Sequence, residues 1–146
     1  MINYTMPNLG LQAKLDLIGL NLDRVICDLF VSPTSISDTL SNSQLVKPSY
    51  DGYIGQIPTG VSIYGGPTIS TPTLQTSYVT FSLTATIPPT TIAGVWWTLV
   101  DGFQGAAVYQ PLAIALLPGG PQVMSQVGDT ILSQLTLTDQ RAAGQP

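Results

Sequence analysis

The chain has 146 residues and a net charge of −4, and 8% of its side chains are charged, against about 25% in an average soluble protein. It contains no His and no Glu, so its charged groups are eight Asp, two Lys and two Arg. Most enzymes that move protons at neutral pH rely on His, Glu or paired Lys. We therefore predict that the protein is not an enzyme. The basic residues are also too scattered to neutralise the phosphates of a nucleic acid.

A chain of this length is expected to form a single domain, residues 1–146. Its longest aliphatic block, residues 112–117, is far shorter than the roughly 20 residues that cross a bilayer, so we expect no membrane partner. The first residues lack the basic start of a secretory signal, and one cysteine cannot form an internal disulfide. We expect synthesis in a cytoplasm. A chain with so many apolar and so few charged residues is also expected to form a homo-oligomer or to be a subunit of a larger assembly.

The N-terminal part predicts an arm and a helix. Residues 1–8 are expected to form the arm, and residues 8–22 a helix whose apolar side chains recur at helical spacing, with Asn8 as its N-cap. These apolar side chains are Leu11, Leu15, Ile18 and Leu22. Two roles stay open for this helix: it covers one open end of a sheet in its own subunit, or it docks on a neighbouring subunit.

Residues 24–32 change to a period of two, which predicts a strand. Cys27 falls on its apolar side, and no His exists to activate the thiol, so we expect an inert core residue. The loop that follows, residues 33–51, is longer than most connections, and such loops often carry contacts. Leu40, Leu45 and Val46 are expected to attach it to the body.

Residues 76–87 give the strongest strand pattern, with hydroxyl side chains alternating with apolar ones. Val79, Phe81, Leu83 and Ala85 are expected to face the core. The hydroxyl-rich face then points to solvent or to a partner.

The strand expected at residues 92–100 contains two adjacent tryptophans, which must point to opposite faces. Trp97 lies on the more apolar side and is the core candidate. Trp96 is the contact candidate, since Trp is enriched at interface centres. The alternative, that the helix or long loop of its own subunit covers Trp96, stays open.

Further short strands complete the pattern, and turn signals separate them. Pro111 cannot donate to a ladder, which predicts an edge position or a bulge for its strand. Seven to nine short strands predict a mainly β fold, an antiparallel β-sandwich of jelly-roll or Ig-like type over residues 24–139, with one short N-terminal α-helix and a tail at 140–146. The remaining strands are expected at residues 53–57, 61–64, 106–116, 122–126 and 131–138.

The sequence carries no motif for a metal, phosphate or cofactor site, so we expect no metal and no cofactor. Nucleophilic catalysis by Ser or Thr would need a base, and neither Lys14 nor Lys47 has a recognisable serine–lysine spacing. A pair of Asp residues brought together by the fold stays open as a hydrolase site.

Several short segments follow one another in a characteristic order along the chain. The leucine-rich helix precedes a strand ending in Pro33-Thr34, the long loop holds Asp38-Thr39, and Gly52-Tyr53 leads into the next strand. Gly94-Val95-Trp96-Trp97 and Gly128-Asp129 follow later. Over residues 9–138 the chain resembles phage capsid decoration (cement) or head-fibre proteins.

The resemblance implies a virion protein, synthesised in the host cytoplasm, that sits on the outer capsid surface. It implies a homo-oligomer, with a trimer favoured, that bridges and stabilises major capsid proteins. A head, neck or tail fibre or adaptor module is one alternative. A carbohydrate-binding adhesive module is another, since aromatic rings stack on sugars. The interface candidates are Ile2, Tyr4, Met6, Leu9, Tyr53, Trp96 and Tyr109.

Overall fold

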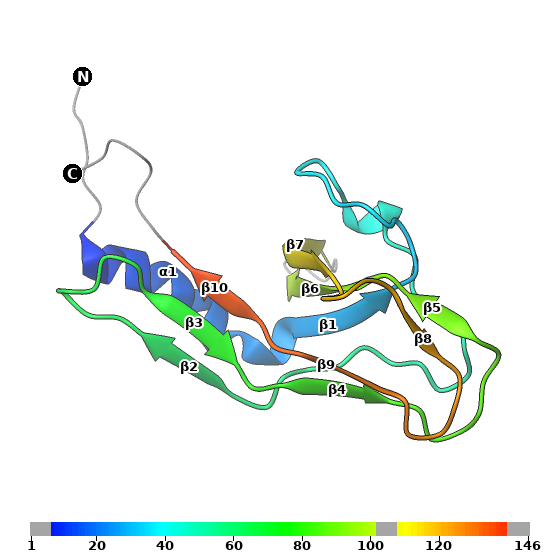
Figure 1. Cartoon of the computed structure of the whole chain (residues 1–146). Coiled ribbons are helices and arrows are strands. Elements are labelled where there is room, and N and C mark those ends of the chain that lie inside the picture. The colour runs from blue at the N-terminus through cyan, green and yellow to red at the C-terminus, as the bar shows by residue number, and fades with distance from the viewer. Residues whose placement is uncertain (1–6, 102–107, 140–146) are drawn as a thin grey trace. The chain divides into compact units, whose positions relative to one another are not determined.

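The computed structural model describes residues 7–101 and 108–139, and within them one α-helix precedes a set of short antiparallel strands (Figure 1). The predicted fold class is confirmed: the chain is mainly β, with several antiparallel sheets and an N-terminal helix, consistent with a β-sandwich. Its contacts group the residues into two compact units. Unit 1 comprises Met1–Leu22, Thr59–Ser77 and Gln134–Pro146, and unit 2 comprises Asp23–Pro58 and Tyr78–Ser133. The single domain over residues 1–146 stays a prediction.

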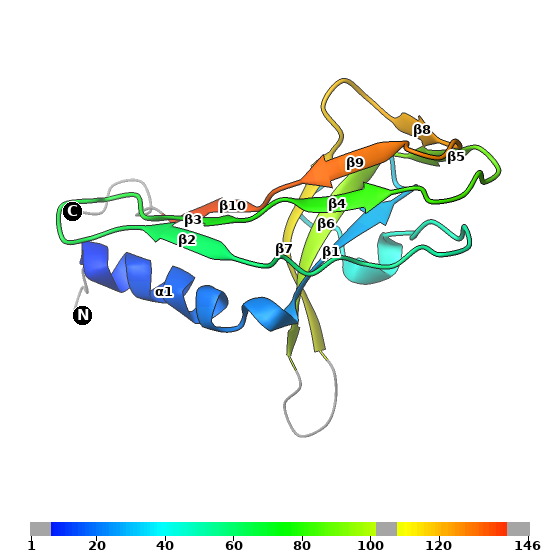
Figure 2. The same ribbon diagram turned by 90° about the horizontal axis from the view of Figure 1, so that it is seen from below.

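Unit 1 is a helix on a three-stranded sheet. The helix α1 (Asn8–Leu20) lies along strands β2 (Val61–Tyr64) and β3 (Thr73–Thr76), with β10 (Thr136–Thr138) on the other side of β3 (Figure 2). Leu11 and Leu15 are buried in the helix, and Leu74 is buried in the sheet. The helix thus covers a sheet face of its own chain, which is close to the first of its two expected roles. Its N-cap is Pro7, one residue earlier than predicted, because Asn8 already has helical geometry.

The first sheet of unit 2 has the order β1-β6-β7, from β1 (Val25–Phe30), β6 (Gly94–Asp101) and β7 (Val108–Leu116). Both predictions for Pro111 are confirmed. β7 is an edge strand of this sheet, and its pairing with β6 shifts register where Trp97 pairs with Ala113 and Thr98 pairs with Pro111. Proline lacks the amide hydrogen that a regular ladder needs, so the irregularity falls there.

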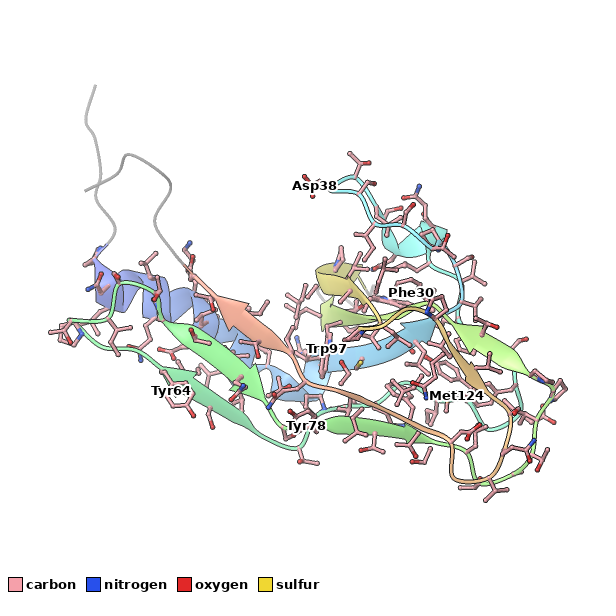
Figure 3. The ribbon with its side chains drawn as sticks, in the orientation of Figure 1. Phe30, Asp38, Tyr64, Tyr78, Trp97 and Met124 are labelled. Carbon is pink, nitrogen blue, oxygen red and sulfur yellow. The ribbon has the colours of Figure 1, made fainter. Side chains whose placement is uncertain are left out.

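The second layer of unit 2 consists of two strand pairs, β4–β9 and β5–β8. Trp97 Nε1 donates a hydrogen bond of 3.2 Å to Ser133 Oγ, which joins β6 to β9 through the interior. Figure 3 labels Trp97 and Met124, which are both buried. The bounds are β4 Val79–Ser82, β5 Thr90–Ile92, β8 Gln122–Met124 and β9 Thr130–Ser133, with 3-10 helices η1 Leu22–Arg24 and η2 Asn42–Gln44.

Three strand predictions need correction. Residues 76–87 do not form one strand: Thr76 is the last residue of β3, which pairs in unit 1, β4 covers only Val79–Ser82 and pairs with β9 in unit 2, and residues 83–87 belong to no strand. The run therefore breaks at 77–78, where its hydrogen-bond partners change, and residues 131–138 divide into β9 and β10 for the same reason. Residues 53–57 form no strand, only a bridge between Gln56 and Cys27. The described residues thus hold ten strands, more than the seven to nine predicted.

The predicted burial of apolar side chains in the 76–87 run is confirmed in part. Val79, Phe81 and Leu83 are buried as predicted, but Ala85 is exposed because the strand has already ended at Ser82. The alternating hydroxyl side chains of this run, Thr80, Ser82, Thr84 and Thr86, are exposed.

The long loop lies over the outer face of the β1-β6-β7 sheet. Leu45 is buried with Phe30 and Trp96, and Leu40 packs against the same cluster. Val46 attaches the loop through its backbone, since its amide donates to the Ser32 carbonyl oxygen at 3.0 Å. Its side chain is exposed, so the predicted apolar attachment is wrong for Val46 and correct for the two leucines.

Candidate functional site

Unit 2 contains a buried carboxylate. Asp28 on β1 is 5% exposed, and its Oδ1 accepts a hydrogen bond of 2.8 Å from the Tyr53 hydroxyl. The same hydroxyl accepts a 2.8 Å hydrogen bond from the Leu29 amide. Lys47 Nζ lies 3.3 Å from the other carboxylate oxygen and 5.7 Å from the centre of the Trp96 ring. Burial, then the hydrogen bond to Asp28 and its charge, raises the pKa of Tyr53, so the phenol stays protonated.

Beside this network lies a cavity of about 610 Å³, which we call the Asp28 cavity. Its walls come from β1, β6, the covering loop and the segment 54–57 that follows the loop, and most of its polar side chains belong to the loop. The volume is typical of small-ligand pockets, which combine apolar walls with few polar groups. The lining residues are Ile26, Asp28, Asn42, Ser43, Leu45, Lys47, Ile54, Gly55, Ile57, Trp96, Thr98 and Val100.

The acidic group at this cavity is engaged within its own chain. Asp28 is already paired with a phenol and an ammonium group, so neither carboxylate oxygen stands free to act as a base. Cys27 points into the buried layer, and burial raises the pKa of its thiol to about 12, which disfavours the reactive thiolate. The described residues hold no group of three or more His, Cys, Asp or Glu side chains arranged to bind a metal ion.

Both tryptophans are buried. Trp97 is 3% exposed, which confirms it as a core residue. Trp96 is also 3% exposed, because Phe30 and Leu45 pack against it and Lys47 lies over its ring. The open alternative for Trp96, coverage by the long loop of its own chain, therefore describes this structure, and apart from the part that lines the Asp28 cavity the residue is covered.

Tyr53 is also packed within its own unit. Its ring is stacked on Phe81 with centroids 6.2 Å apart, and the ring of Tyr50 meets it edge-on at 5.5 Å. Its hydroxyl is engaged by Asp28. Tyr53 thus connects the end of the loop region to β1, through Asp28, and to β4, through Phe81. The sequence did not reveal this role, because Asp28 and Phe81 lie 25 and 28 residues from Tyr53 along the chain.

The other interface candidates divide into two groups. Leu9 is 55% exposed on α1, and its contact with a partner stays a prediction. Tyr109 belongs to β7, where its backbone pairs with Val100, but its side chain lies outside the described residues. Ile2, Tyr4 and Met6 also lie outside the described residues.

The helix presents a second apolar face that the sequence interpretation missed. Leu17 and Leu20 are 64% and 80% exposed, and Ala13 is exposed between them and Leu9. A helix turns about 100° per residue, so these four positions lie on the side opposite Leu11 and Leu15. We call Leu9, Ala13, Leu17 and Leu20 the outer seam. The signal was present in the sequence as apolar residues on a second side of the helix, which Asp16 borders.

The sheets add uncharged, hydroxyl-rich surfaces. In unit 1, the sheet exposes Ser62 and Tyr64 on β2 and two threonines, Thr136 and Thr138, on β10. In unit 2, β4 exposes Thr80 and Ser82. Figure 3 labels Tyr64 and Tyr78, which are both exposed large side chains.

No family model, curated protein or solved structure matches the chain. Among the described residues, no helix is long and apolar enough to cross a membrane. The candidate function therefore rests on the surfaces and the cavity of the chain itself.

Proposed function

We propose that this chain is a structural binding protein that works by being held against neighbouring proteins. The observation that carries the proposal is the outer seam of α1, four apolar positions left exposed on a helix whose opposite face is already packed. Exposed apolar surface of this kind is costly in water and marks a site that another surface covers.

The remaining surface supports the same function. Many of its exposed sheet positions carry hydroxyl groups in place of charges. Burying a Ser or Thr in a contact costs far less than burying an unpaired ion, because a hydroxyl can find a partner on either side of the interface. A protein that meets large, flat neighbours gains from such a surface.

The state of the ionisable groups agrees with a role that makes and breaks no bonds. The Cys27 thiol has a pKa raised to about 12 and the Tyr53 phenol also has a raised pKa, both mainly through burial. Asp28 is enclosed by partners from its own chain. These groups support packing in unit 2, so we do not propose an enzyme.

As the specific role we propose a capsid decoration, or cement, subunit of a phage head, which binds the major capsid protein on the outer virion surface. The resemblance in segment order supports this proposal. Such a protein stabilises the lattice by linkage: a partner that binds only the assembled shell adds RT ln(1 + [L]/Kd), about 4 kcal/mol per site at a thousandfold excess over Kd. Many sites on one shell make the total effect large.

Copy number on purified virions tests this role. Quantitative gel densitometry of virions should give hundreds of copies for a cement subunit, whereas a head, neck or tail fibre or adaptor would give tens. Heads stripped of the protein should rupture at a lower temperature and recover their stability when the purified chain is added back. Absence of the chain from virions, or failure of the purified chain to sediment with heads, would refute the proposal.

A further inference from the structure

One wall of the Asp28 cavity carries a buried hydroxyl group that lacks a partner. Thr98 on β6 lines the cavity and is 3% exposed, and its Oγ1 has no hydrogen-bond partner within residues 7–101 and 108–139. An unpaired buried hydroxyl costs free energy, so in a cavity wall it points to a ligand that completes its hydrogen bonding. We propose that the Asp28 cavity binds a small uncharged molecule, mainly apolar, whose hydroxyl or carbonyl group pairs with Thr98 Oγ1. This binding site is additional to the proposed function and does not depend on it.

The sheet holds the Thr98 hydroxyl in a defined position. β6 is the central strand of the β1-β6-β7 sheet, and its register with β1 pairs Ile26 with Thr98 and Asp28 with Trp96. These four cross-strand neighbours all line the cavity and form its floor. The pairing of β6 with β7 shifts register between Trp97 and Thr98, and irregularities of this kind re-aim side chains next to binding sites.

The walls around the floor are mainly apolar. They include Leu45 from the loop, Ile54 and Ile57 from the segment 54–57, and Val100 from β6. Ile54 and Ile57 are 68% and 50% exposed, so the cavity opens to solvent beside them and a ligand can enter there. Its volume of about 610 Å³ is typical of sites for small molecules, in which a few polar groups orient a mostly apolar ligand.

The charges at the cavity favour an uncharged ligand. Lys47 Nζ lies 3.3 Å from Asp28 Oδ2, and the Tyr53 hydroxyl donates to Asp28 Oδ1. An anionic ligand would compete with Asp28 for Lys47, and a cationic ligand would compete with Lys47 for Asp28. Either would disturb an ion pair whose acidic member is buried, which is costly. An uncharged group that pairs with Thr98 leaves the ion pair in place.

Two matched probes test the site. p-Cresol and toluene differ by one hydroxyl group, and both are uncharged at neutral pH. In a ¹H–¹⁵N NMR titration of the full chain, each should give saturable shifts of amide signals on β1, β6 and the loop around the cavity. One hydrogen bond should make p-cresol bind about two- to tenfold more tightly than toluene. If neither probe shifts these signals up to its solubility limit, or if the shifts fall on other elements alone, the proposal is wrong.

Thr98→Val isolates the contribution of the hydroxyl. Valine has nearly the same shape, so toluene should bind the variant as it binds the parent, whereas p-cresol should lose its advantage over toluene. The melting temperature should not fall, because the change replaces an unpaired hydroxyl with a methyl group. Thr80→Val is the matched control, since Thr80 is an exposed threonine of β4 outside the cavity, and it should leave both affinities unchanged. A retained preference for p-cresol, or a clear loss of stability in Thr98→Val, would overturn the assignment of this hydroxyl to a ligand.

A charged analogue tests the class of ligand. p-Toluate carries a carboxylate in place of the hydroxyl of p-cresol and should bind the parent chain at least about tenfold more weakly, because its charge must be desolvated beside an existing ion pair. Tighter binding of p-toluate would define an anion site and contradict the proposal. Binding of p-cresol by a chain that never binds phage heads would refute the proposed function and leave this site intact.

Discussion

Replacing Trp97 with Ala should strongly destabilise unit 2. The indole is 3% exposed, and its Nε1 donates to Ser133 Oγ across the interior. Removing a buried tryptophan costs the transfer free energy of the ring plus the cavity left behind, together about 3–5 kcal/mol. Since a whole domain is stable by only about 5–15 kcal/mol, the variant should be partly unfolded at elevated temperature.

Urea unfolding followed by circular dichroism would measure this loss. Trp97→Phe keeps most of the ring, so we expect a smaller loss than for Trp97→Ala. Combining Trp97→Phe with Ser133→Ala in a double-mutant cycle should isolate the hydrogen bond, which we expect to contribute about 0.5–1.5 kcal/mol. Leu132→Ala, next to Ser133 but exposed, is the control and should change stability little. A loss below about 1 kcal/mol for Trp97→Ala would refute the placement of the ring in the core.

Three further predictions concern the same unit. Gly94→Ala should lower the melting temperature because a Cβ there would meet the Phe30 ring, whereas Gly60→Ala, with open space around it, should not; equal melting temperatures would contradict this packing. Tyr53→Phe should cost about 1–3 kcal/mol in urea unfolding, since it removes the hydroxyl that donates to a buried carboxylate; an unchanged midpoint would show that this bond is dispensable. Burial raises the pKa of Cys27 from its ordinary 9.0 to about 12, so the unfolded chain loses this proton first as pH rises. The free energy of unfolding should therefore fall by about 1.4 kcal/mol per pH unit across that window, and Cys27→Ala should remove that part of the slope; identical slopes would be the contrary result.

The two tryptophans show what the alternation of side chains along a strand can predict and what it cannot. Alternation along β6 requires Trp96 and Trp97 to point to opposite faces, and it identified Trp97 as core. It could not reveal the coverage of the other face, because that depends on Leu45 and Lys47, which lie about 50 residues earlier in the chain. The Asp28 cavity could not be predicted for the same reason, because it forms only where β1, β6 and the loop region meet in the folded chain.

The sequence by itself determined the elements whose signals are local. Helical spacing specified α1, a period of two specified β1 and β6, and the missing amide hydrogen of Pro111 marked the edge and irregularity of β7. It also placed apolar residues on both sides of α1, although that second face was overlooked.

Only the tertiary structure decided which strands pair and what each face meets. The 76–87 run has one continuous alternation, yet it divides at 77–78 because β3 and β4 have different hydrogen-bond partners. Asp28 can be buried because Lys47 from the loop and Tyr53 from the segment after it contact both carboxylate oxygens. Side-chain periodicity depends on neighbours within a few residues, whereas pairing and burial depend on distant segments that meet only after folding.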